Sequence, residues 1–272
     1  MEKVKEIERS LITEFKNGIW KKFVASVNEY KLIEDGDKIA VCISGGKDSM
    51  LMAKCFQELK KHGKNNFEIE FIVMDPGYNK ENRKKIEDNA KLLEVPIKIF
   101  ESDIFSIVDN MDQGSPCYMC ARMRRGHLYT YAKDLGCNKI ALGHHFNDAI
   151  ETIMMGLLYN GQIQTMMPKL HSTNFEGMEL IRPLYRVSED EIISWAKKNG
   201  LSFLQCACKM TENAEIDENA SKRREMKTLI KQLKKTNPGA DLSIFKSVYN
   251  VNLETILGYK KDGKEHFFLD DY

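Results

Sequence analysis

Two adjacent glycines and a lysine stand where an apolar run gives way to a helical pattern. The run is Ile39 to Ile43, and the residues after it are Ser44-Gly45-Gly46-Lys47-Asp48-Ser49. Glycines let the backbone approach an anion without a Cβ in the way, and N–H groups at the start of the next helix point outward. Lys47 adds a positive charge, and Asp48 can hold Mg²⁺ against phosphate. The segment predicts a nucleotide phosphate site in which both serines donate hydrogen bonds; the alternative is a strand-to-helix turn without a ligand.

A second polar group follows the apolar run Ile140 to Leu142. It reads Gly143-His144-His145-Phe146-Asn147-Asp148. We expect Gly143 to contact the nucleotide and Asp148 to orient Mg²⁺ or to take a proton. Alternatively, Asn147 or Asp148 caps the next helix. Two adjacent histidines on one loop rarely bind the same metal ion, so packing at the nucleotide site is favoured over zinc.

Seven cysteines occur in the chain, and in a cytosolic protein their spacing indicates metal or redox chemistry rather than disulfides. Cys117 and Cys120 are three residues apart, just before a helix expected to begin near Ala121, where both can reach one ion. Cys206 and Cys208 form a second pair. These cysteines suit zinc as well as an iron–sulfur cluster. The remaining three are predicted to be small buried hydrophobic residues, namely Cys42, Cys55 and Cys137.

Short apolar runs alternate with polar stretches of helical period in the middle of the chain. The runs are Ile39 to Ile43, Ile69 to Met74, Ile97 to Phe100 and Ile140 to Leu142. They predict an α/β fold with a parallel sheet and helices on both faces, which binds ligands at the carboxyl ends of the strands. Asp75 lies at that edge, and is either a magnesium or ribose contact of the nucleotide or a turn residue.

The flanking regions are expected to be helical. Residues 1–35 carry apolar residues at helical spacing and predict one amphipathic helix that packs on the domain of residues 36–185. Residues 186–272 predict a mainly helical region, with helices near Glu189 to Lys198 and Glu218 to Lys235. Two expected helices are basic, with Arg122, Arg124 and Arg125 on one and Lys222, Arg223, Arg224, Lys227, Lys231, Lys234 and Lys235 on the other. They suit an RNA backbone, although a lysine-rich stretch is often only a solvated face.

Bulk composition excludes several classes of protein. The 272 residues are 42% hydrophobic and 30% charged, as in ordinary globular proteins, and charges interrupt each apolar run before it reaches membrane-spanning length. The N-terminus lacks the apolar core of a secretory signal, so we expect a cytoplasmic protein that does not enter a membrane. The net charge of +1 excludes a uniformly basic surface but not a local basic strip.

The segment Ser44 to Ser49 resembles the signature of the PP-loop ATP pyrophosphatases. That resemblance implies a Rossmann-like fold of the HUP type and cleavage of ATP between the α- and β-phosphates. Gly143 to Asp148 is similar to the Gly-His-His-x-Asp-Asp segment of the same superfamily, with Asn147 in place of the first aspartate. The resemblance therefore leaves the chemistry of this segment to Asp148.

Residues 116–126, Pro-Cys-Tyr-Met-Cys-Ala-Arg-Met-Arg-Arg-Gly, resemble a stretch of the tRNA-cytidine 2-sulfurtransferase (TtcA) family, and Ile181-Arg182-Pro183-Leu184 also fits it. The family implies a [4Fe-4S] cluster held by three cysteines, with Cys117 and Cys120 inserted in the PP-loop domain and Cys208 in the C-terminal region. Cys206 stays possible as the third ligand, because the family usually has Cys-x-x-Cys where this sequence has Cys-x-Cys. Arg124, one turn after Cys120, is expected to face the cluster and to stabilise developing negative charge.

The sequence thus predicts an ATP-dependent tRNA sulfurtransferase that forms AMP and pyrophosphate. Its expected cofactors are ATP, Mg²⁺ and the cluster. Its expected partners are the anticodon region of tRNA, a sulfur donor such as a cysteine desulfurase or free sulfide, and a second copy in a homodimer. Two alternatives remain open: a PP-loop enzyme that uses another base or nucleophile, and a non-catalytic, zinc-stabilised RNA-binding protein.

Overall fold

The structure is a computed structural model that describes residues 2–63, 65–109, 116–204 and 218–272. The chain forms two compact units, which are described separately. The first comprises Met1–Ala149 and Met166–Lys222, and the second comprises Ile150–Thr165 and Arg223–Tyr272. The domain ranges 1–35, 36–185 and 186–272 stay a sequence-based prediction.

A mostly parallel six-stranded sheet forms the centre of the first unit. Its strands are β1 (Lys38–Ile43), β2 (Glu68–Asp75), β3 (Ile97–Glu101), β4 (Lys139–Ala141), β5 (Lys169–His171) and β6 (Glu179–Ile181), in the order β3-β2-β1-β4-β6-β5. All the predicted apolar runs are parallel strands, so the predicted fold class is confirmed. The edge strand β5, which is antiparallel to β6, was not predicted. From β1 the chain adds β2 and β3 on one side, and then adds β4 on the other side of β1. Ligands of open α/β folds bind at such a change of side, which here lies between β1 and β4.

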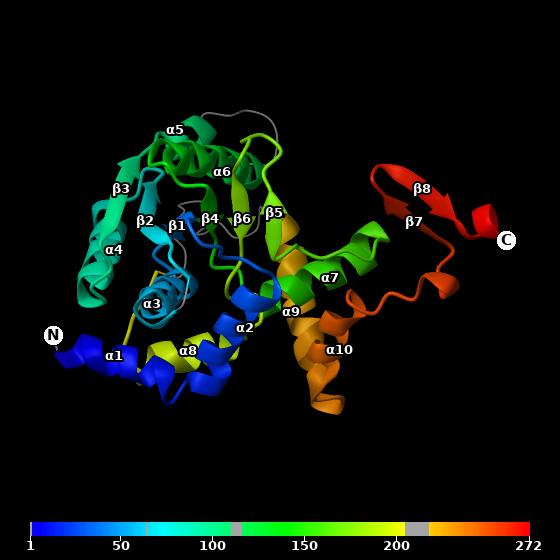
Figure 1. Ribbon diagram of the computed structural model, residues 1–272, viewed down its shortest axis with the longest axis horizontal. Helices are drawn as coiled ribbons and strands as arrows, with labels where there is room; N and C mark the ends of the chain where they lie inside the picture. The colour runs from blue at the N-terminus through cyan, green and yellow to red at the C-terminus, as the bar shows by residue number, and fades with distance from the viewer. Residues whose placement is uncertain (1, 64, 110–115, 205–217) are drawn as a thin grey trace. The chain divides into compact units, whose positions relative to one another are not determined.

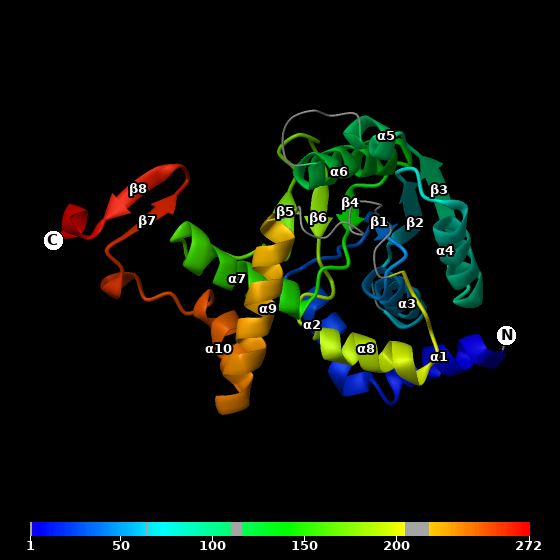
Figure 2. The same ribbon diagram turned by 180° about the vertical axis from the view of Figure 1, so that it is seen from behind.

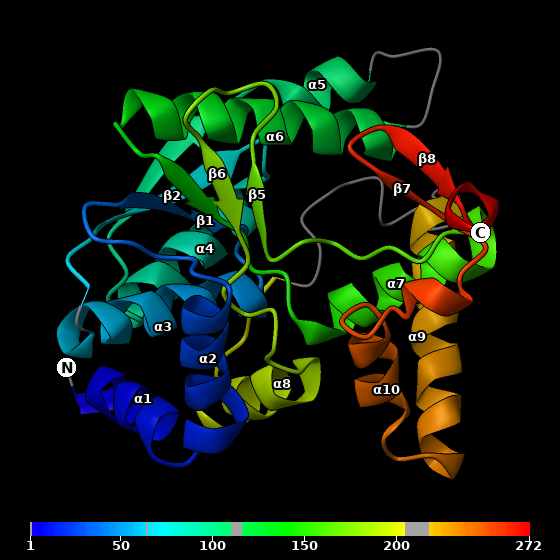
Figure 3. The same ribbon diagram turned by 45° about the vertical axis from the view of Figure 1, so that its right-hand side comes forward.

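Helices cover both faces of the sheet (Figures 1 and 2). Ile39, Val41 and Ile43 belong to the core that contains α1, α2, α3, α4 and α8, whereas Ala40 and Cys42 belong to the core with α6 (Figure 3). Burial on both faces explains why the strands read as continuous apolar runs rather than as alternating patterns.

Helices of the first unit occupy most of the polar stretches. They are α1 (Glu2–Ile12), α2 (Lys21–Glu29), α3 (Lys47–His62), α4 (Lys80–Leu92), α5 (Ile104–Asp109), α6 (Pro116–Asp134) and α8 (Glu189–Lys198), together with the first residues of α7 (Phe146–Asn160). The bounds predicted for α8 are confirmed.

The N-terminal segment is not the single helix that was predicted. A π-helical turn, η1 (Lys16–Trp20), separates α1 from α2. From Ile7 onward, apolar residues repeat every fourth residue. Successive residues of an α-helix are rotated by about 100° about the helix axis, so each apolar residue would be displaced by about 40° around the helix from the one before. The wider π turn corrects that drift. All of the spaced apolar residues are therefore buried: Val4, Ile7, Leu11, Phe15, Ile19, Phe23 and Val27.

The second unit contains the remainder of α7, helices α9 (Glu218–Thr236) and α10 (Ala240–Ser247), and a hairpin of β7 (Gly258–Lys261) and β8 (Lys264–Phe267). The helix α9 was predicted, but the hairpin was not. Asp262 and Gly263 join its strands with φ of 50° and 74°. Asp-Gly between two short strands is a strong hairpin signal. It was overlooked because the region as a whole was predicted to be mainly helical.

Among the helices in the described ranges, none is long and apolar enough to cross a membrane.

Candidate active site

The predicted phosphate loop connects β1 to α3. Gly45 adopts a φ of +82°, and a Cβ there would lie 2.6 Å from Cγ1 of Ile86 on α4. Gly46 is the N-cap residue of α3, and it has no side chain that could accept hydrogen bonds from the first N–H groups of the helix. Glycine is therefore required at position 45, and the helix start presents N–H groups without a capping side chain, as an anion site needs.

The two serines of the loop hold its shape. Ser49 Oγ accepts from Ser44 N at 3.2 Å and donates to Gly46 O at 3.0 Å. Ser44 Oγ lies 3.2 Å from Ser49 Oγ. Both hydroxyls thus interact with the loop itself, a role that was not anticipated.

Lys47 lies between two carboxylates. Its Nζ is 3.2 Å from Asp48 Oδ2 and 3.2 Å from Oε1 of Glu189, the first residue of α8. Burial acts to lower the pKa of the Lys47 ammonium, but the two carboxylates outweigh burial and raise that pKa above its ordinary value. Lys47 is therefore a fixed cation at the start of α3. Sequence reasoning missed Glu189, which is 142 residues away and was read only as part of a helix start.

The second motif packs directly on the phosphate loop. A Cβ on Gly143 would lie 3.1 Å from Ser49 N, closer than most Cβ contacts, so glycine favours this approach. His145 is buried, with Nε2 3.8 Å from Asp48 Oδ1 and Nδ1 3.4 Å from Asp148 Oδ2. The structure therefore brings Gly143, Asp48 and Asp148 together around His145, in accord with the packing interpretation of the histidines.

One atom of this cluster is suited to bind a cation. Asp48 Oδ1 is buried and accepts no hydrogen bond from any residue that the structure describes. A buried carboxylate oxygen without a donor is costly, and Mg²⁺ prefers such ligands. The site fits a magnesium ion carried by a nucleotide.

Asn147 and Asp148 both make capping contacts. Asn147 Oδ1 accepts from Glu189 N at 2.9 Å, so it caps α8 rather than its own helix. Asp148 Oδ2 accepts from His145 N at 2.9 Å, the backward bond of a capping box at the start of α7.

Asp75 serves the turn after β2. Its Oδ1 accepts from Gly77 N at 2.9 Å and from Tyr78 N at 2.7 Å, and its Oδ2 lies 3.0 Å from Arg83 Nη1. Of the two predicted roles, these contacts fit the turn residue.

The predicted metal-binding cysteines are only partly within the described residues. The helix α6 begins at Pro116, five residues before the predicted start, because proline is favoured at a first helical position. Cys117 and Cys120 therefore both lie on the helix. Cys120 is half-buried and packs against Met74 and Ile104.

Cys206 and Cys208 lie outside the described residues. The chain that leads to them is nevertheless anchored, because Leu204 N donates to Gly45 O at 3.2 Å. The described chain before this cysteine pair therefore ends in contact with the phosphate loop.

The other three cysteines are buried hydrophobic residues, as predicted. Burial raises the pKa of Cys42 to about 12 and that of Cys137 to about 11, and it also raises the pKa of Cys55. None of the three is a thiolate at neutral pH.

The basic residues of α6 and α9 separate into different roles. On α6, Arg124 is half-buried, and Arg122 and Arg125 are exposed. On α9, Arg223 Nη1 lies 3.8 Å from the buried Glu151, and Lys234 Nζ lies 2.5 Å from Asp241. Four exposed cations of α9 lie three or four residues apart and therefore share one face of the helix. We call them the α9 stripe: Arg224, Lys227, Lys231 and Lys235.

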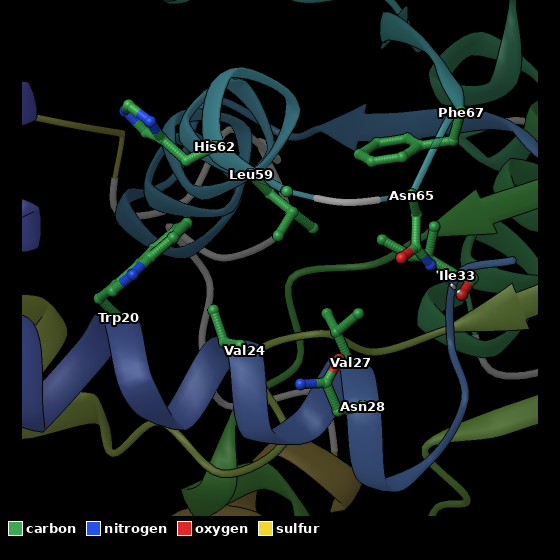
Figure 4. Close-up of a pocket in the computed structure, with 10 residues that line it drawn as sticks. Trp20, Val24, Val27, Asn28, Ile33, Leu59, His62, Asn65 and Phe67 are labelled. Atoms are coloured by element: carbon green, nitrogen blue, oxygen red, sulfur yellow. Dashed lines mark hydrogen bonds between the residues drawn. The ribbon is translucent and has the colours of Figure 1, made fainter. Parts of the chain in front are cut away.

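A cavity of about 370 Å³ lies away from these residues, between α2, the end of α3 and the start of β2 (Figure 4). Trp20, Leu59 and Phe67 line it. These residues lie near the amino ends of β1 and β2, whereas the phosphate loop follows the carboxyl end of β1. The cavity is therefore not part of the candidate active site.

Comparisons with known proteins agree with this geometry. A family model described as a PP-loop domain matches residues 16–215. A tRNA-cytidine(32) 2-sulfurtransferase of Geotalea uraniireducens is 34% identical over 92% of this chain and 96% of its own. The protein of that name from Coxiella burnetii is 33% identical over 94% and 95%.

A solved structure, the U34-tRNA thiolase NcsA from Methanococcus maripaludis with its [4Fe-4S] cluster, superposes with a TM-score of 0.66 over 87% of this chain and 80% of its own. At 21% identity this likeness concerns the fold.

Proposed function

Because the chain belongs to the tRNA-cytidine 2-sulfurtransferase family of PP-loop proteins, we propose that it replaces the C2 oxygen of a tRNA cytidine with sulfur at the expense of ATP. The observation that carries the proposal is the hydrogen bond between Leu204 and Gly45 of the phosphate loop. There the phosphate loop accepts a hydrogen bond from Leu204, at the start of the segment that bears the second cysteine pair. A nucleotide site that is hydrogen-bonded to the residue two positions before the second cysteine pair suits a reaction that activates a base and then thiolates it.

ATP supplies a leaving group in this reaction. A carbonyl oxygen is displaced poorly, so the C2 oxygen first attacks the α-phosphate and expels pyrophosphate. Lys47 and the uncapped N–H groups of α3 bind the phosphates that leave. Sulfide then attacks C2, and the original oxygen departs as part of AMP.

Asp48 and Asp148 complete the nucleotide site. Asp48 Oδ1 would hold the magnesium ion of the substrate, because it is buried and accepts no hydrogen bond from the described residues. Asp148 lies on the other side of His145 and keeps that imidazole next to Asp48. Arg124, on the helix of Cys120, would stabilise the negative charge that develops as AMP leaves.

Three cysteine thiolates would hold a [4Fe-4S] cluster: Cys117, Cys120 and Cys208. The donor set fits, because thiolates are stabilised near a helix N-terminus and the three other thiols of the described chain are buried and protonated. When bound by these three cysteines, the cluster would supply sulfide to the activated base. A cysteine desulfurase or free sulfide would supply the sulfur.

The α9 stripe would bind the backbone of the anticodon arm, with cytidine 32 as the target, the position in the names of the relatives. Four exposed cations on one helical face follow a row of phosphates better than scattered lysines do. A tRNA substrate also places the reaction in the cytoplasm.

The test is mass spectrometry of tRNA nucleosides from a strain that lacks the gene. We expect 2-thiocytidine to disappear, and to return with the wild-type gene but not with Cys120→Ala. Restoration by Cys42→Ala, which removes a buried thiol of β1, is the matched control. Unchanged 2-thiocytidine in the deletion strain would refute the proposed function.

A further inference from the structure

Arg182 is a buried cation that forms no ion pair with any residue that the structure describes. Three cationic side chains are buried among the described residues: Lys54, Lys139 and Arg182. Lys54 lies 2.8 Å from Glu8, and Lys139 lies 2.7 Å from Asp37. Arg182, only 8% exposed, donates from Nε to His144 Nδ1 at 3.3 Å and from Nη1 to the carbonyl oxygen of Met167, and both acceptors are neutral.

A buried charge without an ion-pair partner is destabilising, since it loses hydration and gains only the weaker attraction of groups beyond contact distance. Burial accordingly lowers the pKa of Arg182 to about 10, while Tyr185 acts in the opposite direction. Two of the five N–H groups of the guanidinium are used in the contacts above, which leaves three for a ligand. An anion with several oxygens matches this fork best.

The position of Arg182 identifies the anion. It directly follows β6, and β4 separates β6 from the strand that ends in the phosphate loop. Two strand spacings amount to about 10 Å. Its partner His144 adjoins Gly143, which packs against Ser49 N of the loop. Arg182 thus lies near the phosphate loop, on the side of the next two strands, beside the position proposed for the phosphates.

We infer that Arg182 binds the phosphate of the adenylyl group, the α-phosphate that is transferred from ATP and departs in AMP. Lys47 and the start of α3 would then serve the pyrophosphate, and Arg182 the adenylyl half. The inference rests on the proposed function, because it assumes that AMP is formed at this site. It also explains why an unpaired guanidinium is kept in the first unit.

The test compares the binding of AMP with that of adenosine by calorimetry. Arg182→Gln keeps a donor for Met167 but removes the charge. We expect its affinity for AMP to fall about ten-fold or more, the loss of one charge-assisted contact, with no change for adenosine. Arg186→Gln, four residues away at an exposed ion pair with Glu29, is the control and should bind AMP like the wild type.

Several results would overturn the inference. Arg182→Gln with an unaltered preference for AMP over adenosine would do so, as would equal losses for both ligands. A loss of tRNA affinity with that preference intact would assign the guanidinium to an RNA phosphate instead. If Arg182→Gln does not fold, Arg182→Lys keeps the charge without the fork, and an unchanged AMP preference in it would count against the inference. Wild-type protein that binds neither AMP nor ATP would refute the proposed function itself.

Discussion

Removal of the α9 stripe should change how tRNA binding responds to salt. The perturbation is the triple variant Arg224→Gln, Lys231→Gln, Lys235→Gln, whose side chains are all exposed and unpaired within the described chain. The opposite face of the helix buries Met226 and Ile230, so the variant should keep its fold. Surface changes of this kind usually alter stability by about 0.5 kcal/mol or less.

The magnitude follows from the number of cations. Each phosphate contact contributes about 0.7 to 0.9 to the slope of log affinity against log salt. Three lost contacts therefore lower the slope by about 2 to 3. Between 50 and 200 mM salt, the wild type should lose about 20- to 40-fold more affinity than the variant.

The assay is filter binding or fluorescence anisotropy with unmodified tRNA over that salt range. The matched control is Lys80→Gln, Lys84→Gln, Lys91→Gln on α4, which also removes three exposed cations. Its slope should equal that of the wild type. Equal slopes for both triple variants and the wild type would show that α9 is a solvated face and not an RNA-binding surface.

Further predictions concern the nucleotide and the cysteines. Lys47→Ala should reduce tRNA-dependent pyrophosphate release from ATP about ten-fold or more without unfolding the protein, and unchanged release would contradict the phosphate-site assignment. Glu189→Gln should tighten ATP binding about two- to five-fold in calorimetry, because its carboxylate competes with phosphate for Lys47; weaker binding would instead make Glu189 part of the ATP site. Protein purified anaerobically should be brown with about three to four irons, and Cys208→Ala should lose this absorbance and the thiolation, whereas Cys206→Ala should retain both. The reverse pattern would move the ligand to Cys206, and loss in both variants would exclude an open iron.

Local patterns were sufficient to predict the strands and the burial of most apolar positions. The runs at β1 to β4 are recognisable because both faces of a parallel strand are apolar. The interruption in the N-terminal helix was not predicted, although its cause is local: a straight α-helix cannot keep a four-residue repeat on one face. The hairpin at Asp262 and Gly263 was missed although its turn signal is local, and β5 was missed because three residues carry too little pattern.

The candidate site divides in the same way between sequence and structure. The sequence by itself determined the residue types of the phosphate loop, the Gly143 motif and the cysteine pairs, because each motif is short and its chemistry depends on neighbouring residues. Only the tertiary structure decided which distant groups meet. Glu189 reaches Lys47 across 142 residues, Leu204 bonds to Gly45, and Arg182 has no ion-pair partner in the described part of the chain. Such contacts depend on strand order and helix packing, so a pattern within one segment of the chain cannot predict them.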